Sequence, residues 1–303
     1  MTIRRWTGAG RKALPPGVIA AVRATVLLWG KATAKFRMTP TFIVAGAQRS
    51  GTTTLYRLLE RHPNLVRPTL SKGTGFFDDN YSRGFRWYSA HFPLRPLTRL
   101  KAGPKRPVHT FELSGYYLLH PLSGERIARD LPEAKIVVVV RDPVERAYSA
   151  HAHELARGFE TEQFERAVQL EPQRTEGERE RLSMDPQYTS FSHRHHSYLA
   201  RSRYAEQIQV LIDAVGRDRV YIMEADRFFA EPAAEFDRLQ AWLGLPLWRP
   251  PRIDQWNQRP REPMPDGVRE RLLDYFAPFD DDLLPLLGHP PIWREPSGSK
   301  LIG

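Results

Sequence analysis

The run Ile136–Val140 constrains the fold of this chain more than any other segment. Its continuous β-branched residues leave no polar face, so a strand formed by them must be covered on both sides. Two further apolar runs, Thr41–Ala47 and Val220–Glu224, have the length of buried strands. Helical periodicity occurs around these runs, over residues 54–62, 143–156, 197–214, 233–243 and 268–277. Alternating strands and helices predict an α/β protein with three α/β/α layers and a central parallel sheet.

Two segments fall outside this pattern. Residues 1–38 are basic and contain an apolar stretch, Val18–Trp29, that Arg23 interrupts. A helix that spans a bilayer needs about 20 apolar residues, so this stretch is too short. We interpret residues 1–38 as a basic arm or surface helix, with peripheral contact to anionic lipid as the alternative. Residues 39–303 are expected to form a single domain in which the polar segment 160–196 is a long excursion, a lid or binding segment.

The composition limits the partners and the catalytic groups that this chain can have. The formal net charge is +10, and arginine, whose planar guanidinium suits phosphate and sulfate, supplies most of the positive charge. This charge suits nucleic acid, an anionic membrane surface or acidic small molecules. Basic and acidic residues are interspersed, so we expect no nucleic-acid partner. The chain has no cysteine, which excludes thiolate nucleophiles and cysteine-ligated metals, and the histidine cluster at 193–196 lacks a matching carboxylate pattern, so we expect no metal.

The segment Gly46–Thr53 (GAQRSGTT) has the glycine spacing of a phosphate-binding P-loop, which makes the predicted fold P-loop-like. Thr52 stands where such loops carry the lysine that contacts the β- and γ-phosphates, and this argues against ATP or GTP hydrolysis. Backbone amides at a helix N-terminus still form an anion site. The expected contacts to the 5′ anionic group of a nucleotide come from five consecutive residues: Arg49, Ser50, Gly51, Thr52 and Thr53.

A second candidate anion site follows the central strand. Arg141 lies at the carboxyl end of that strand, and Pro143 predicts a helix start that places Ser149 about two turns along. Ligands of parallel sheets bind at the carboxyl ends of the strands, where the P-loop segment also falls. Two neighbouring anion sites suit a nucleotide with two separated phosphates, as in a 3′-phosphoadenosine nucleotide.

The two motifs together resemble a known family. The segment 41–56 (TFIVAGAQRSGTTTLY) looks like the 5′-phosphosulfate loop of the sulfotransferases that use 3′-phosphoadenosine-5′-phosphosulfate (PAPS). The segment 141–149 (RDPVERAYS) looks like their 3′-phosphate motif, in which the arginine and the serine hold the phosphate. The resemblance is to the carbohydrate and heparan sulfate branch and its bacterial relatives, and it covers almost the whole chain after Met38.

The resemblance implies a sulfotransferase fold and a reaction. PAPS would be the co-substrate, and its sulfuryl group would move to a hydroxyl or amine of a carbohydrate, glycolipid or other small acceptor, without a metal. Arg49 would offset charge on the leaving phosphate. Arg259 and Arg261 fall where relatives close a loop over the nucleotide. Without a spanning segment, the expected location is cytoplasmic, with room for membrane association through the basic arm.

The catalytic base departs from the family pattern. Many carbohydrate sulfotransferases have a glutamate a few residues before an aromatic pair, and here Gly73 stands at that position before Phe76. We expect Glu112 to be the replacement base, then His109, and then a histidine of the cluster His193, His195 and His196. The alternative for Glu112 is a structural residue, held by backbone amides or an arginine. Two other interpretations remain open: a catalytically weak relative that binds PAPS or polyanions, and a P-loop kinase.

Overall fold

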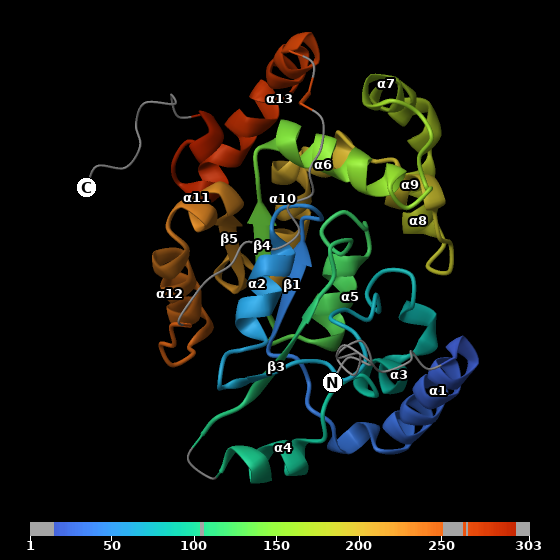
Figure 1. Ribbon diagram of the computed structural model, residues 1–303, viewed down its shortest axis with the longest axis vertical. Coiled ribbons are helices and arrows are strands. Elements are labelled where there is room, and N and C mark those ends of the chain that lie inside the picture. Colours follow the sequence, from blue (N-terminus) through green and yellow to red (C-terminus); the bar gives the residue numbers. More distant parts are fainter. Residues whose placement is uncertain (1–14, 104–105, 251–262, 265, 295–303) are drawn as a thin grey trace.

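The computed structural model describes residues 15–103, 106–250, 263–264 and 266–294 (Figure 1). Its centre is a parallel sheet of five strands in the order β2-β3-β1-β4-β5. The strands are β1 (Phe42–Gly46), β2 (Leu65–Val66), β3 (His109–Leu113), β4 (Lys135–Val140) and β5 (Val220–Glu224). The central strands β1 and β4 are buried along almost their whole length, as their apolar runs predict.

The helices of the described residues surround this sheet. They are α1 (Pro16–Ala32), α2 (Thr52–Leu59), α3 (Phe85–Ser89), α4 (Arg95–Ala102), α5 (Ser123–Asp130), α6 (Pro143–Leu155), α7 (Phe164–Thr175), α8 (Glu178–Met184), α9 (Phe191–His195), α10 (Tyr204–Val215), α11 (Ala225–Ala230), α12 (Pro232–Leu243) and α13 (Asp266–Leu287). Single 3-10 turns are η2 (Ala34–Phe36), η3 (Tyr81–Arg83), η4 (Ala200–Ser202), η5 (Arg217–Arg219) and η6 (Ile292–Arg294). No helix of the described part of the chain has the length and apolar character needed to cross a membrane.

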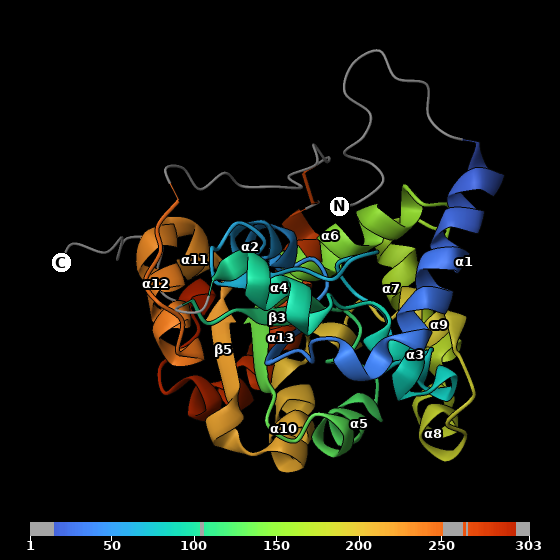
Figure 2. The same ribbon diagram turned by 90° about the horizontal axis from the view of Figure 1, so that it is seen from below.

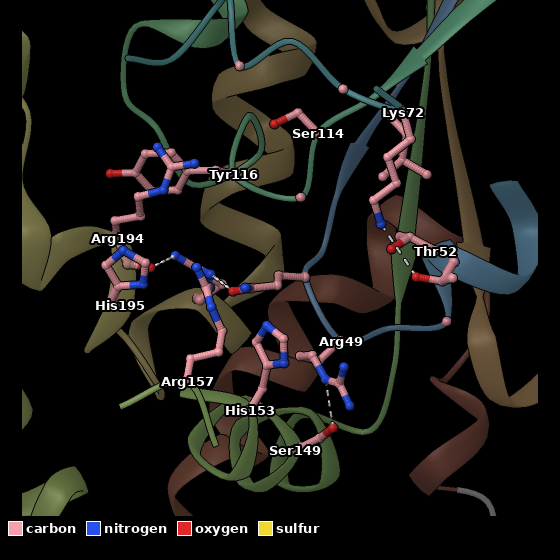
Figure 3. A pocket seen from close by; sticks show the side chains of 18 of the residues that line it. Arg49, Thr52, Lys72, Ser114, Tyr116, Ser149, His153, Arg157, Arg194 and His195 are labelled. Carbon is pink, nitrogen blue, oxygen red and sulfur yellow. Dashed lines mark hydrogen bonds between the residues drawn. The ribbon is translucent and has the colours of Figure 1, made fainter. Parts of the chain in front are cut away.

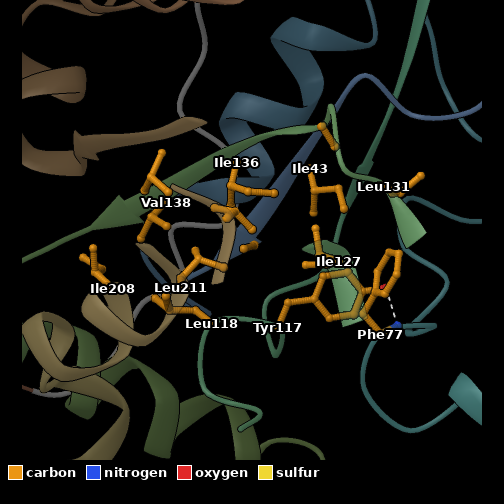
Figure 4. Close-up of a cluster of buried hydrophobic side chains, with 14 of the residues drawn as sticks. Ile43, Phe77, Tyr117, Leu118, Ile127, Leu131, Ile136, Val138, Ile208 and Leu211 are labelled. Carbon is orange, nitrogen blue, oxygen red and sulfur yellow. Dashed lines mark hydrogen bonds between the residues drawn. The ribbon is translucent and has the colours of Figure 1, made fainter. Parts of the chain in front are cut away.

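Both faces of the sheet are covered, because successive residues of each strand point to opposite sides. On one face Ile43, Ile136 and Val138 pack with apolar residues of α5 and α10 (Figure 4). On the other face Val44 and Val137 pack with residues of α2 and α12. The expected three-layer α/β/α fold is confirmed.

The helix after β4 begins where Pro143 predicts. The carboxylate of Asp142 accepts hydrogen bonds from the amides of Val144 and Glu145, at 2.8 and 3.1 Å, and so caps α6. A third apolar cluster joins α6 to α7 and α13, which fixes the position of the helix against the sheet. The face of α6 that carries Ser149 is therefore held at the carboxyl end of β4.

The polar segment 160–196 folds into α7, α8 and α9, which its composition did not reveal. The buried carboxylate of Glu171 accepts hydrogen bonds from the amides of Leu199 and Ala200, at 2.7 and 2.8 Å. Such buried acceptors satisfy backbone donors, and the apolar residues of α7 join the cluster with α6 and α13, so a largely polar sequence forms an ordered excursion. The helix expected over 197–214 begins later, as α10, after the turn η4.

Candidate functional site

A cavity of about 1060 Å³ lies at the carboxyl ends of β1, β3 and β4. Three walls enclose it: the loop after β1, the segments 72–75 and 113–116, and one face of α6 together with α9. Single-ligand sites in proteins measure roughly 300–1,000 Å³, so this cavity has room for a nucleotide and part of a second substrate.

The loop after β1 turns sharply into α2. Gly51 caps the helix with a φ of 82°, and a β-carbon at this position would lie 2.7 Å from the ring of Phe229. Glycine is therefore required for both the backbone conformation and the close packing. The turn aims the N-terminus of α2, with Thr52 and Thr53, into the cavity. Ser50 is fully buried and is not among the residues that line the cavity.

The two predicted phosphate motifs meet in this cavity. The Nε of Arg49 donates to the Oγ of Ser149 at 3.1 Å (Figure 3). Arg141 also lines the cavity, and its guanidinium approaches the backbone oxygen of Arg49 at 3.5 Å. A carboxylate oxygen of Glu145 lies 3.7 Å from Arg141 and orients it. The structure thus brings Arg49, Arg141 and Ser149 together as the sequence predicts, from segments about 100 residues apart.

Positive charge dominates the walls. The lining cations are Arg49, Lys72, Arg141, Arg157, Arg194 and Arg201, and none of the described residues that line the cavity is Asp or Glu. Carboxylates lie behind some of these cations: Asp79 pairs with Arg194, and Glu154 lies 3.5 Å from Arg157. These carboxylates hold the arginines in place while the cavity itself presents only cationic and neutral groups, which suits a ligand with several negative charges.

Lys72 is a lining cation that the sequence reasoning missed. Its Nζ lies 3.5 Å from the Oγ1 of Thr53, across the cavity from Ser149 (Figure 3). Burial, and then the charges of Arg49 and Arg57, lower the pKa of Lys72. The available signal was its place directly before Gly73, in the segment that the family resemblance had already marked.

Comparison with known proteins gives the family. The protein-family model described as "Sulfotransferase domain" matches residues 39–262 of the sequence. The chain belongs to the sulfotransferase family. The crystal structure of a sulfotransferase from Alicyclobacillus acidocaldarius has a TM-score of 0.61 and 27% identity, and the match covers 83% of this chain and 96% of that one.

Curated relatives of this sulfotransferase include enzymes named for heparan sulfate. It is 27% identical to heparan sulfate glucosamine 3-O-sulfotransferase 5 of Mus musculus over 72% of its own length. It is also 27% identical to the bifunctional heparan sulfate N-deacetylase/N-sulfotransferase 1 of Caenorhabditis elegans over 68% of its length. The matches span only 56% and 22% of those two relatives.

The position of Glu112 does not support its expected role as the base of this sulfotransferase. The side chain is fully buried and is not among the residues that line the cavity. Its carboxylate accepts hydrogen bonds from the amide and hydroxyl of Thr74 and from the hydroxyls of Tyr88 and Tyr117, at 2.5 to 3.0 Å. Burial raises the pKa of Glu112, although these hydrogen bonds oppose the shift. With its acceptor sites used, Glu112 braces the loop at 74–77 from behind the cavity wall.

The backbone at Gly73 is shaped for glycine. A β-carbon there would lie 2.0 Å from the backbone oxygen of Leu113, a distance that real structures do not show. The amide of Leu113 donates to the backbone oxygen of Lys72 at 3.0 Å, which brings the two segments this close. A glutamate therefore does not fit the backbone at position 73 unless this part of the cavity wall moves.

His109 lies away from the cavity. It begins β3, whereas Leu113, which lines the cavity, ends that strand four residues later, or about 13 Å away. His109 instead borders a small separate pocket with Met38 and Thr98. Its position at the amino end of the strand does not support the expected role of proton acceptor.

Two histidines do line the cavity. The Nδ1 of His195 lies 2.9 Å from a carboxylate oxygen of Glu154. Burial favours the neutral form of Glu154, but the hydrogen bond and charge of His195 outweigh it and lower the pKa of Glu154. The other oxygen of Glu154 accepts from the side chain of Gln48 at 3.3 Å, so the pair is tied to the phosphate loop. His153, one helical turn beyond Ser149, also lines the cavity.

The other candidate residues differ in whether they line the cavity. His193 is buried with its Nδ1 2.8 Å from the hydroxyl of Tyr116, and the Nε2 of His196 lies 3.0 Å from the backbone oxygen of Phe159. Of the three clustered histidines, only His195 is among the cavity-lining residues. His153 was missed, although its spacing of four from Ser149 on a helix was the signal. Arg259 and Arg261 lie outside the described residues, and the described residues contain no cluster able to hold a metal ion.

Proposed function

We propose that this protein transfers a sulfuryl group from PAPS to a hydroxyl or amine of a carbohydrate acceptor. The observation that carries the proposal is the cavity itself, in which a P-loop without its lysine and the segment of Arg141 and Ser149 meet among cations, with no carboxylate among the described lining residues. PAPS has a phosphosulfate at the 5′ position and a phosphate at the 3′ position, so it has one anionic group for each of the two proposed sites.

The donor would bind through residues of both motifs. The amides at the start of α2, with Thr52, Thr53 and Lys72, would hold the 5′-phosphosulfate. Arg141 and Ser149 would hold the 3′-phosphate. Arg49 contacts Ser149 and would lie between the 5′-phosphosulfate and the 3′-phosphate. Its guanidinium, which stays charged, would contact the 5′-phosphate at the oxygen that bridges to sulfur.

The bonds that form and break in this transfer can be accounted for without a metal ion. The acceptor oxygen or nitrogen attacks sulfur, the bond between sulfur and the bridging oxygen breaks, and that electron pair leaves on adenosine 3′,5′-bisphosphate. Arg49 and Lys72 stabilise the charge that develops on the leaving phosphate. The acceptor must lose its proton, and this proton needs a base on the acceptor side of the cavity.

His195 supplies that base in this proposal. Its Nδ1 faces Glu154, which leaves Nε2 for the acceptor proton, and the ionised Glu154 stabilises the imidazolium that forms. In Figure 3 His195 lies toward Tyr116 and Arg194, whereas His153 lies beside Arg49. His153 is therefore assigned to the donor side, as a group that contacts the nucleotide.

A carbohydrate acceptor rests on two observations. Arg194 lies over the ring of Tyr116, at 5.0 Å from the ring centroid, so the acceptor side combines an aromatic surface with cations. Sugars that carry carboxylate or sulfate groups fit such a wall. The curated relatives are named for heparan sulfate, a sugar polymer, which supports the same class of acceptor.

Calorimetry with adenosine 3′,5′-bisphosphate tests the donor site, with 5′-AMP and ATP as comparison ligands. Tight binding that is lost without the 3′-phosphate is the expected result. Arg141→Ala should weaken binding at least tenfold, since removing a cation from a phosphate contact costs about 1.5–3 kcal/mol. The control is Arg271→Ala, which removes an exposed arginine of α13 paired with Glu165. Equal affinity for nucleotides with and without the 3′-phosphate would overturn the donor assignment.

A further inference from the structure

Helix α1 is apolar yet exposed. Between Val18 and Trp29 its only charged residue is Arg23, and the side chains of Val18, Val22, Leu28 and Trp29 all face solvent, with Leu28 69% exposed. An apolar helix of a folded protein is normally covered by protein or by lipid. The exposed face of α1 therefore calls for a partner.

The carboxyl end of α1 is firmly attached to the body. Gly30 packs so closely on α3 that a β-carbon there would lie 2.7 Å from the β-carbon of Ala90. The guanidinium of Arg37, just beyond η2, lies over the ring of Trp29 and donates to the backbone oxygens of Ala90 and Phe92. The helix is thus held in a defined place while its outer face stays open.

A second exposed apolar patch adjoins the first. Leu97 and Leu100 on α4 are exposed, Leu100 by 80%, and Phe36 in η2 is exposed as well. The strand-like bridge between Arg37 and Leu94 joins the end of η2 to the start of α4. Figure 1 shows α4 and the carboxyl end of α1 at the lower end of the molecule, and Figure 2 looks onto this end, with α4 near the centre and α1 at the right. We call the outer faces of α1, η2 and α4 the α1–α4 surface.

Charge identifies the partner of this surface. Basic and acidic residues are interspersed along most of the chain, but residues 1–59 and 80–111 contain none of its 35 aspartates and glutamates. The exposed cations of α1, η2 and α4 are Arg23, Lys31, Lys35, Arg95, Arg99 and Lys101, and Arg83, Arg86 and Arg106 are exposed on neighbouring segments of the chain. A second protein surface would ordinarily mix both signs, whereas anionic lipid headgroups match a surface of cations and apolar side chains without acids.

We propose that the α1–α4 surface binds to the surface of an anionic lipid bilayer. Leu28, Trp29 and Leu100 insert at the level of the headgroups, and the lysines and arginines contact lipid phosphates. The elements η2 and α4 precede the amino ends of β1 and β3, whereas the cavity lies at the carboxyl ends. Membrane binding therefore leaves the proposed donor site accessible, and the inference stands independently of the proposed function.

Vesicle co-sedimentation of the full chain tests the proposal, with phosphatidylcholine vesicles compared against phosphatidylcholine mixed with phosphatidylglycerol. Strong binding only to the anionic vesicles, weakened by added salt, is expected. The double variant Leu97→Ser with Leu100→Ser should weaken binding at least tenfold, and Lys31→Glu with Lys35→Glu should do the same.

Matched controls change similar side chains elsewhere. Met184→Ser removes an apolar side chain of α8 that is 77% exposed, and Arg181→Glu reverses an exposed charge on the same helix. Both should bind anionic vesicles like the parent protein. Thermal melting confirms that each variant is folded. Equal binding to neutral and anionic vesicles would overturn the proposal, and so would a dimer in sedimentation velocity that the Leu97 and Leu100 variant converts to monomer, since a second copy would then cover the surface.

Discussion

Substitution of Glu112 distinguishes between two roles of this residue, a structural role in holding the loop at 74–77 and a role as the catalytic base. The Glu112 carboxylate accepts four hydrogen bonds and is fully buried. In Glu112→Gln the amide oxygen can still accept from Thr74 and Tyr117, while the amide nitrogen faces the hydroxyl of Tyr88, which can accept. The loss is then the charge assistance of these bonds, about 1–2 kcal/mol of the free energy of unfolding.

Glu112→Ala should cost more. It removes the acceptor for every one of these donors and leaves a void, which together amount to roughly 4 kcal/mol. Tyr117→Phe is the matched control, because it removes one hydrogen bond to Glu112 and the two that Tyr117 accepts from the amides of Phe76 and Phe77. It should fall near Glu112→Gln in stability.

Two measurements on each variant decide between the roles. Urea unfolding gives the free energy of unfolding, and transfer of radiolabelled sulfate from PAPS to a desulfated heparan oligosaccharide gives kcat. For a brace, Glu112→Gln loses stability and keeps kcat within a few-fold of the parent. A base would lower kcat by roughly 10²–10⁴-fold in the same variant. That loss of kcat, with an unchanged unfolding free energy, would refute the assignment of Glu112 as a structural residue.

Three further outcomes follow from the same geometry. His195→Asn and Glu154→Gln should each lower kcat about 100-fold while the affinity for adenosine 3′,5′-bisphosphate stays unchanged; a kcat close to that of the parent protein in His195→Asn would exclude His195 as the base. Gly73→Glu should not restore a family-type base, and it should lower the melting temperature because its β-carbon meets the backbone oxygen of Leu113; a more active, equally stable variant would contradict this. Burial raises the pKa of Asp78 to about 6 from an ordinary 3.8, so the folded state binds this proton more tightly than the unfolded state. Stability from this group is present below about pH 4 and is lost as pH rises through about 6, by roughly 3 kcal/mol in total, and urea unfolding of Asp78→Asn across this window should lack that slope.

Local sequence patterns were sufficient to predict the fold and to mark the two segments that meet in the cavity. The apolar run Ile136–Val140 predicts a strand covered on both faces, and the spacing of Gly46 and Gly51 predicts a tight turn into a helix. Pro143 predicts the start of the helix that carries Ser149. Each of these signals depends on a few neighbouring residues, since strand propensity, positive φ and helix starts are set by local sterics and hydrogen bonding.

The chemistry of the acceptor side depends on contacts between distant segments. His195 meets Glu154 across 41 residues, and Gln48 reaches the same carboxylate across 106. The burial of Glu112 likewise depends on Thr74 and Tyr88, which lie on other segments of the chain. The residues next to a carboxylate or an imidazole in the sequence do not indicate whether that side chain will line a cavity or be buried and hydrogen-bonded. The packing of elements far apart in the sequence decides this. The segments that we propose to bind anions could thus be recognised from the chain alone, while the proposal of His195 as the base required the folded structure.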